Sequence, residues 1–163
     1  MHSYTAPITA LADNEVFVFG ANPQGFHGAG SAGYASFGVP GNQWRAFGYG
    51  NKPHGWKGLW NEKGKTGPMI GTHGKSYGLV TVKRAGAKCS MSIDEITMEV
   101  EKLYECALRN PGWTFYVAQS GTSGLNGWPP EQMAEAFAAF PVPPNISFDS
   151  TFFPFVERAC GAP

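Results

Sequence analysis

Two glycine-rich segments of this sequence carry the residue types that a phosphate-binding loop needs. They span residues 20–38 and 119–128, and each contains several glycines beside serine, threonine or asparagine. Glycine allows bare backbone N–H groups to approach an anion, and the positive end of a following helix adds to the attraction. A single loop of this kind could be an ordinary turn. Two of them in equivalent positions predict a bipartite site for a phosphate or a diphosphate.

Each glycine-rich segment follows a run of residues that is typical of a buried β-strand. β-branched and aromatic residues dominate 15–20 and 113–118, and similar runs predict strands at 77–82 and 145–148. In an open α/β sheet the carboxyl ends of the strands face one crevice, where ligands bind. The two loops are therefore expected to meet at the same edge of the sheet.

Helices are expected between these strands. Ser92 and Glu95 form a capping box ahead of apolar residues spaced by three and four, which predicts a helix from Ile93 onward. Pro129 or Pro130 is expected to open another helix. Alternating strands and helices predict an α/β protein.

Other site chemistries fit the residues less well. Gly28 to Gly33 has the glycine spacing of a dinucleotide fingerprint, but seven residues separate Gly20 from Gly28, too many for that turn. The segment 121–125 would need glycine in place of Leu125 to form a nucleophile elbow. The histidines lack helical or hairpin pairing with a carboxylate, so we expect no metal site and no cofactor.

The charge of the chain is balanced overall but not along its length. Twelve basic and twelve acidic residues cancel, which argues against a general nucleic-acid coat protein. Nine of the basic residues and a single acidic residue lie between positions 45 and 88. A basic middle favours an anionic ligand, although a solvated basic loop would have the same composition.

Residues 39–76 show no sustained period and are expected to form an irregular insertion, rich in glycine, aromatic and basic residues, within a single domain over 1–163. Aromatic and basic side chains alternate between positions 44 and 60, and such residues can stack on the bases of a single strand. A nucleic-acid-binding accessory protein is therefore an alternative function. A small satellite core under a long loop would explain the same residues.

Targeting signals are not evident. No apolar run approaches the roughly 18 residues of a membrane span, and the first residues lack a basic region followed by an apolar one. The three cysteines match neither a disulfide framework nor a zinc spacing. We expect a cytoplasmic protein without a membrane partner. The oligomeric state stays open.

The two loops resemble those of the macro domains, the ADP-ribose-binding module. Gly20-Ala21-Asn22 is followed, after four intervening residues, by His27-Gly28-Ala29-Gly30. The second loop reads Thr122-Ser123-Gly124-Leu125-Asn126-Gly127-Trp128-Pro129. Leu79-Val80-Thr81-Val82-Lys83-Arg84 is similar to a strand of the compact branch, which contains terminal ADP-ribose glycohydrolases and short phage and prophage proteins. The resemblance covers about residues 15–38 and 77–148.

This resemblance implies a three-layer α/β/α sandwich with a mixed, mostly parallel central sheet. It also implies a cleft for ADP-ribose, or for the ADP-ribose group of a modified macromolecule, with Asn22 near the ribose. The implied ligand-binding residues are Gly20, Ala21, Asn22, His27, Gly28, Ala29, Gly30, Ser31, Thr122, Ser123, Gly124, Leu125 and Asn126.

The catalytic residues of the family are not intact in this chain. The branch uses a lysine nucleophile and an aspartate acid/base, and Val82 and Asn126 stand at the matching positions. Lys83 is one residue along, which in a strand directs its side chain to the opposite face. Hydrolysis of an ADP-ribose adduct would then depend on Asn22 and on His27, which could hold a water or bond a phosphate oxygen. A scaffold with an inactive pocket is the further alternative.

Overall fold

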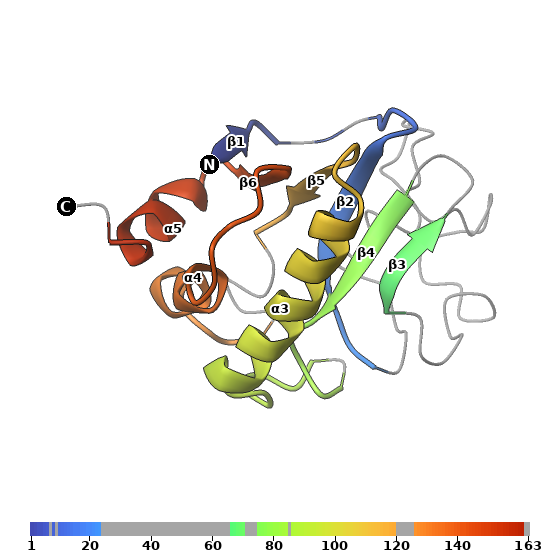
Figure 1. The fold of residues 1–163 in the computed structure, drawn as a ribbon. Coiled ribbons are helices and arrows are strands. Elements are labelled where there is room, and N and C mark those ends of the chain that lie inside the picture. Colours follow the sequence, from blue (N-terminus) through green and yellow to red (C-terminus); the bar gives the residue numbers. More distant parts are fainter. Residues whose placement is uncertain are drawn as a thin grey trace.

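A mixed six-stranded sheet with the order β1-β6-β5-β2-β4-β3 forms the centre of the molecule (Figure 1). The computed structural model describes residues 1–6, 8, 10–23, 66–70, 75–84, 86–119 and 126–161. The strands are β1 (His2–Tyr4), β2 (Glu15–Ala21), β3 (Gly67–Ile70), β4 (Lys75–Val80), β5 (Thr114–Val117) and β6 (Ile146–Asp149). Neighbouring strands are parallel except β3 and β4, which are antiparallel. The predicted mixed, mostly parallel sheet is confirmed.

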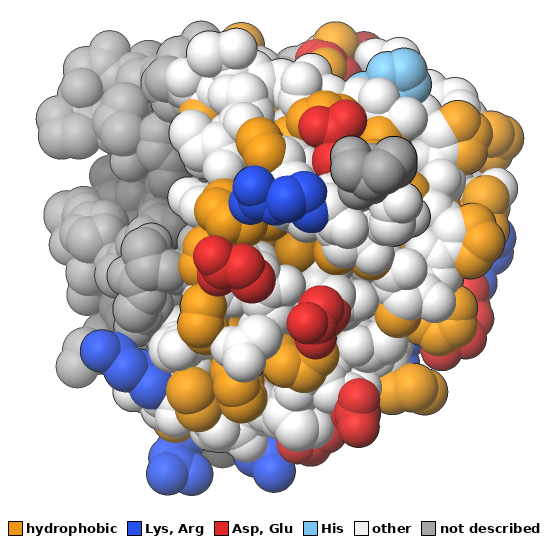
Figure 2. Space-filling model, turned by 90° about the vertical axis from the view of Figure 1, so that its left-hand side faces the viewer, with side chains coloured by type: hydrophobic (Ala, Val, Ile, Leu, Met, Phe, Trp, Pro, Cys, Tyr) orange, Lys and Arg blue, Asp and Glu red, His pale blue; other side chains and the backbone are white. Residues whose placement is uncertain are grey.

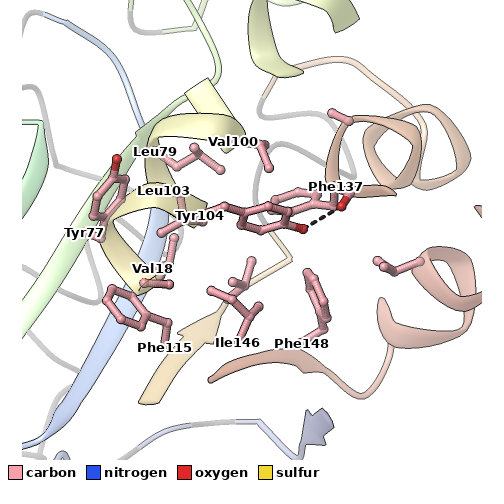
Figure 3. Packing of buried hydrophobic residues seen from close by; sticks show 14 of the residues in the cluster. Val18, Tyr77, Leu79, Val100, Leu103, Tyr104, Phe115, Phe137, Ile146 and Phe148 are labelled. Atoms are coloured by element: carbon pink, nitrogen blue, oxygen red, sulfur yellow. Dashed lines mark hydrogen bonds between the residues drawn. The ribbon is translucent and has the colours of Figure 1, made fainter. Parts of the chain in front are cut away.

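One face of the sheet is covered by the three described helices, α3 (Ile93–Arg109), α4 (Pro130–Ala138) and α5 (Phe153–Ala159). Alternate residues of the strands, among them Val18, Leu79 and Phe148, meet the helices in a continuous apolar core (Figure 3). Because side chains alternate along a strand, the same register sends the intervening residues to the other face.

The other face of the sheet is buried as well. Phe19 is 0% exposed, and Phe17 and Ser76 on this face are also buried. The α/β class is therefore confirmed, and burial of both faces is compatible with the expected three-layer α/β/α sandwich.

The helix starts follow their sequence signals. Ser92 caps α3, its side chain accepting the Glu95 N–H at 3.1 Å while the Glu95 carboxylate accepts the Ser92 N–H at 3.0 Å. Pro130 is the first residue of α4. Proline is tolerated there because the N–H that it lacks would have no acceptor within the helix. Within the described ranges, no helix is long and apolar enough to cross a membrane.

The expectation of an irregular segment over 39–76 was wrong at its carboxyl end. Gly67–Ile70 forms β3, and Lys75 already belongs to β4. Pro68 obscured this strand in the sequence, but β3 lies at the edge of the sheet, where proline is tolerated because one side of the strand needs no donor. Residues 24–65 lie outside the described part, so the rest of the insertion stays a prediction.

Candidate functional site

The candidate site lies at the carboxyl ends of β2 and β5. These strands are parallel neighbours, with Val18 opposite Val117, and the Ala118 N–H donates to the Val18 carbonyl at 3.0 Å. From β2 the chain returns to the sheet at β3 and β4, whereas from β5 it passes through α4 to β6 on the opposite side (Figure 1). The sheet thus has a topological switch point between β2 and β5, which is where open α/β sheets bind their ligands.

Asn22 lies at this switch point. It follows the last residue of β2, and it is only 5% exposed. The Ala21 carbonyl accepts the Thr81 N–H at 3.0 Å, so the backbone after β4 begins at the same edge of the sheet. The amide of an asparagine offers both donors and an acceptor, which suits ribose hydroxyls. The structure therefore places Gly20, Ala21 and Asn22 where the sequence predicts the first half of the site.

Asn126 comes from the second loop, but its side chain serves the interior of the protein. The residue is 0% exposed. Its Oδ1 accepts the Trp128 N–H at 3.0 Å, and its Nδ2 lies 3.3 Å from the Met133 sulfur in α4. The Asn126 amide consequently fixes the end of the second loop onto α4.

The ends of the loops after β4 and β5 pack together as one unit, which we call the docked loop pair (residues 81–84, 86–91 and 126–128). The Cys89 N–H donates to the Asn126 carbonyl at 2.5 Å, and the Trp128 Nε1–H donates to the Met91 carbonyl at 2.8 Å. Gly127 has φ +86, and a Cβ there would lie 2.8 Å from the Cys89 sulfur. Only glycine fits this close approach, so the docking fixes where the second loop ends.

Sequence reasoning missed this role of Cys89, Met91 and Trp128. Neither Cys89, which has φ 53, nor Met91 stands in a motif that marks it. The glycine at 127 was the available signal, because glycine is typical of positions with a positive φ or a close backbone approach.

Val82 and Lys83, the residues nearest the family's lysine position, lie just beyond β4. The strand ends at Val80 rather than at the predicted residue 82, so strand alternation does not govern them. Val82 is nevertheless buried, and the exposed Lys83 pairs through Nζ with the Glu95 carboxylate at 3.6 Å. The hydrogen bond from the Ser92 N–H, followed by the charge of Lys83, holds the pKa of Glu95 below its usual value despite a small opposing effect of burial. Lys83 thus interacts with the start of α3.

Basic side chains gather at the carboxyl edge of the sheet. Lys83, Arg84 and Lys88 are exposed in the segment that follows β4. Figure 2 shows Lys and Arg side chains along the lower end of the molecule, which is the end where β4 runs into this segment in Figure 1. This charge favours an anionic ligand near the switch point.

Several predicted site residues lie outside the described ranges and stay predictions. They are His27, Gly28, Ala29, Gly30, Ser31, Thr122, Ser123, Gly124 and Leu125. The aromatic and basic residues between 44 and 60, on which the nucleic-acid alternative depends, also lie outside these ranges.

The fold and the switch point define an α/β protein with a candidate ligand site at the carboxyl edge of its sheet. No family model matches the chain, and no curated protein matches it. In the described part of the chain, no three His, Cys, Asp or Glu side chains come together as a metal site would require.

Proposed function

We propose that this protein binds ADP-ribose, or a related nucleotide diphosphate, at the carboxyl ends of β2 and β5. The observation that carries the proposal is the parallel pairing of these strands at the switch point of the sheet. A glycine-rich segment follows each of them in the sequence. The resemblance of both segments to macro-domain loops supports the same ligand.

The groups at the carboxyl edge of the sheet suit a nucleotide diphosphate. Backbone N–H groups of Gly28 to Gly30 and of 122–126 would bind the diphosphate, as glycine-rich loops do in other phosphate sites. The buried Asn22 amide would bond the ribose hydroxyls. Arg84 and Lys88 add positive charge at the same edge without contacting the ligand in this proposal.

Removal of ADP-ribose from a modified macromolecule is a second step of the proposal and depends on Asn22 and His27. Asn126 has no carboxylate to exchange a proton, and both polar groups of its amide are engaged within the protein. The reaction would therefore use a water held by His27 or Asn22 rather than the lysine nucleophile and the aspartate acid/base of the compact branch.

Calorimetry with ADP-ribose tests the binding proposal. We expect saturable heat with the wild-type protein, and loss of this heat in Gly28→Glu, because a carboxylate in the loop would repel the diphosphate. Gly112→Glu is the matched control, since it adds the same charge at a position with nothing within 4 Å, in the turn before β5. The control should bind as the wild type does. Absence of heat with millimolar ADP-ribose would refute the proposal.

Hydrolysis is tested separately, on a protein or oligonucleotide that carries ADP-ribose. A slower release of ADP-ribose by the Asn22→Ala and His27→Ala variants than by the wild type supports the catalytic assignment of these two residues. Release that stays unchanged in both variants shows that the assignment is wrong, even where calorimetry confirms binding.

A further inference from the structure

A second concave site lies at the opposite end of the sheet from the switch point. It is a hollow of about 400 Å³ lined by β1 and by the amino-terminal parts of β5 and β6. Its lining includes His2, Tyr4, Thr114, Tyr116 and Ser147. The volume lies in the range of small-molecule sites, which is roughly 300–1,000 Å³. Nothing in the proposed nucleotide site uses these residues.

Two tyrosine rings form one side of the hollow. The rings of Tyr4 and Tyr116 meet edge to face, with centroids 5.1 Å apart and planes at 75°. Tyr4 belongs to β1 and Tyr116 to β5, so the pair is held by strands on either side of β6. Aromatic rings held in this way present an electron-rich face that attracts organic cations.

Each tyrosine has a carboxylate near it. The Tyr116 hydroxyl donates to the Glu15 carboxylate, and Tyr4 is paired in register with Asp149, the last residue of β6. The Asp149 Oδ1 also accepts the Thr151 N–H at 2.8 Å and the Thr151 hydroxyl at 2.6 Å. The Glu15 hydrogen bond, then burial and the Glu15 charge, raise the pKa of Tyr116 to about 12. Burial, and after it the Asp149 charge, raises the pKa of Tyr4. Both phenols therefore stay neutral beside a negative charge.

The described lining of the hollow contains no acidic, lysine or arginine side chain, and hydroxyls of serine, threonine and tyrosine predominate in it. Ser147 lines it although the residue is only 5% exposed. Lys75 also lies at the amino end of the sheet, where its ammonium donates to the Asp13 carbonyl and lies 5.1 Å from the Trp113 ring centroid. Lys75 is thus engaged by Asp13 and Trp113, and the hollow itself offers neutral acceptors, aromatic rings and the Glu15 carboxylate bonded to Tyr116, which favour a cation over an anion.

We infer that this hollow is a binding site for a small organic ammonium ion. The ring faces of Tyr4 and Tyr116 would contact the cation, and Glu15 and Asp149 would supply the negative potential. The hydroxyl of Ser147 would accept a hydrogen bond from the ligand.

A pair of probes of equal shape separates charge from fit. Choline and 3,3-dimethyl-1-butanol differ in one atom, a quaternary nitrogen against a carbon. Both are titrated into the isotope-labelled full chain at low ionic strength, and proton–nitrogen correlation spectra are recorded. We expect choline to shift the amide signals of Tyr4, Thr114 and Ser147 saturably. The neutral probe should bind about tenfold more weakly, as a desolvated cation–π contact predicts.

Two variants test the source of the attraction. Glu15→Gln keeps an acceptor for the Tyr116 hydroxyl but removes the charge, and it should weaken choline binding at least about threefold. Glu131→Gln removes the same charge from the exposed start of α4 and should leave choline binding unchanged.

Three results would overturn the inference. They are equal binding of the two probes, no shift at high millimolar choline, and an equal loss of affinity in both variants. The comparison of the probes uses wild-type protein, so it decides the matter even where Glu15→Gln does not fold.

Discussion

Gly127→Ala is the substitution for which the structure predicts the most specific loss of stability. The residue has φ +86, and an added Cβ would lie 2.8 Å from the Cys89 sulfur and 2.9 Å from the Lys88 Cβ. A left-handed backbone costs a non-glycine residue about 1–2 kcal/mol, and overpacking costs about 1–3 kcal/mol. We therefore expect the free energy of unfolding to fall by about 2–5 kcal/mol.

Two other glycines separate these contributions. Gly86 has φ +73 with nothing within 4 Å of an added Cβ, so Gly86→Ala should show the backbone strain alone, about 1–2 kcal/mol. Gly112 has neither positive φ nor a neighbour within 4 Å, and Gly112→Ala should change stability by less than about 0.5 kcal/mol. Urea titrations followed by circular dichroism measure all three.

A double variant tests the contact itself. Adding Cys89→Gly to Gly127→Ala removes the sulfur that the new Cβ meets, and it should recover about 1 kcal/mol relative to the sum of the single changes. If Gly127→Ala costs no more than Gly86→Ala, the loops after β4 and β5 do not pack as described, and the reasoning about the docked loop pair is refuted.

Three further substitutions probe the core and the start of α3. Phe148→Ala should cost about 3–5 kcal/mol in urea unfolding, because the side chain is fully buried; a cost below about 1 kcal/mol would contradict this packing. Tyr104→Phe should cost about 1–2 kcal/mol, since its hydroxyl donates to the buried Phe137 carbonyl at 2.5 Å (Figure 3); an unchanged urea midpoint would contradict that bond. Glu95→Gln keeps an acceptor for the Ser92 N–H but removes the charge. Because the folded pKa of Glu95 lies below its ordinary value of 4.5, its charge stabilises the native state above that pH and ceases to do so as the pH falls through the folded pKa. The gap in stability between wild type and variant should therefore narrow in acid, and a constant gap would show that the charge plays no part.

The sequence predicted those elements whose signals are local. The capping box at Ser92 and Glu95 fixed the start of α3, and apolar runs located β2, β5 and β6 within one or two residues. Each of these signals depends on residues that are near one another in the chain. Such signals do not depend on contacts with distant parts of the chain.

The elements that the sequence did not predict owe their structure to distant partners. β1 has only three residues and becomes a strand by pairing with β6. β3 contains Pro68 and exists as a strand only through β4. α5 has seven residues and is held by the burial of Phe152 and Val156 in the core. None of these partners can be identified from the segment alone.

The site shows the same division at the level of single residues. Asn22 matches an asparagine of the macro-domain motif, whereas Asn126 stands where the compact branch has an aspartate, and the sequence predicts both as ligand-binding residues. In the structure Asn22 directly follows β2, and the amide of Asn126 accepts the Trp128 N–H and lies 3.3 Å from the Met133 sulfur. A motif position predicts where a residue lies along the chain. It does not predict which internal groups will engage the side chain.

The two ends of the sheet differ in charge, and this difference links the two proposed sites. Arg84 and Lys88 are exposed beyond the carboxyl end of β4, and the positive end of the α3 helix dipole follows them in the chain. At the opposite end, the Glu15 carboxylate accepts the Tyr116 hydroxyl, and the ammonium of Lys75 donates to the Asp13 carbonyl. A parallel sheet favours this separation of charge between its two ends, because the loops that precede helices all leave from the carboxyl edge. The charge therefore favours an anion at the switch point and a cation in the hollow. The same charge would weaken binding of the cation at the switch point and of the anion in the hollow.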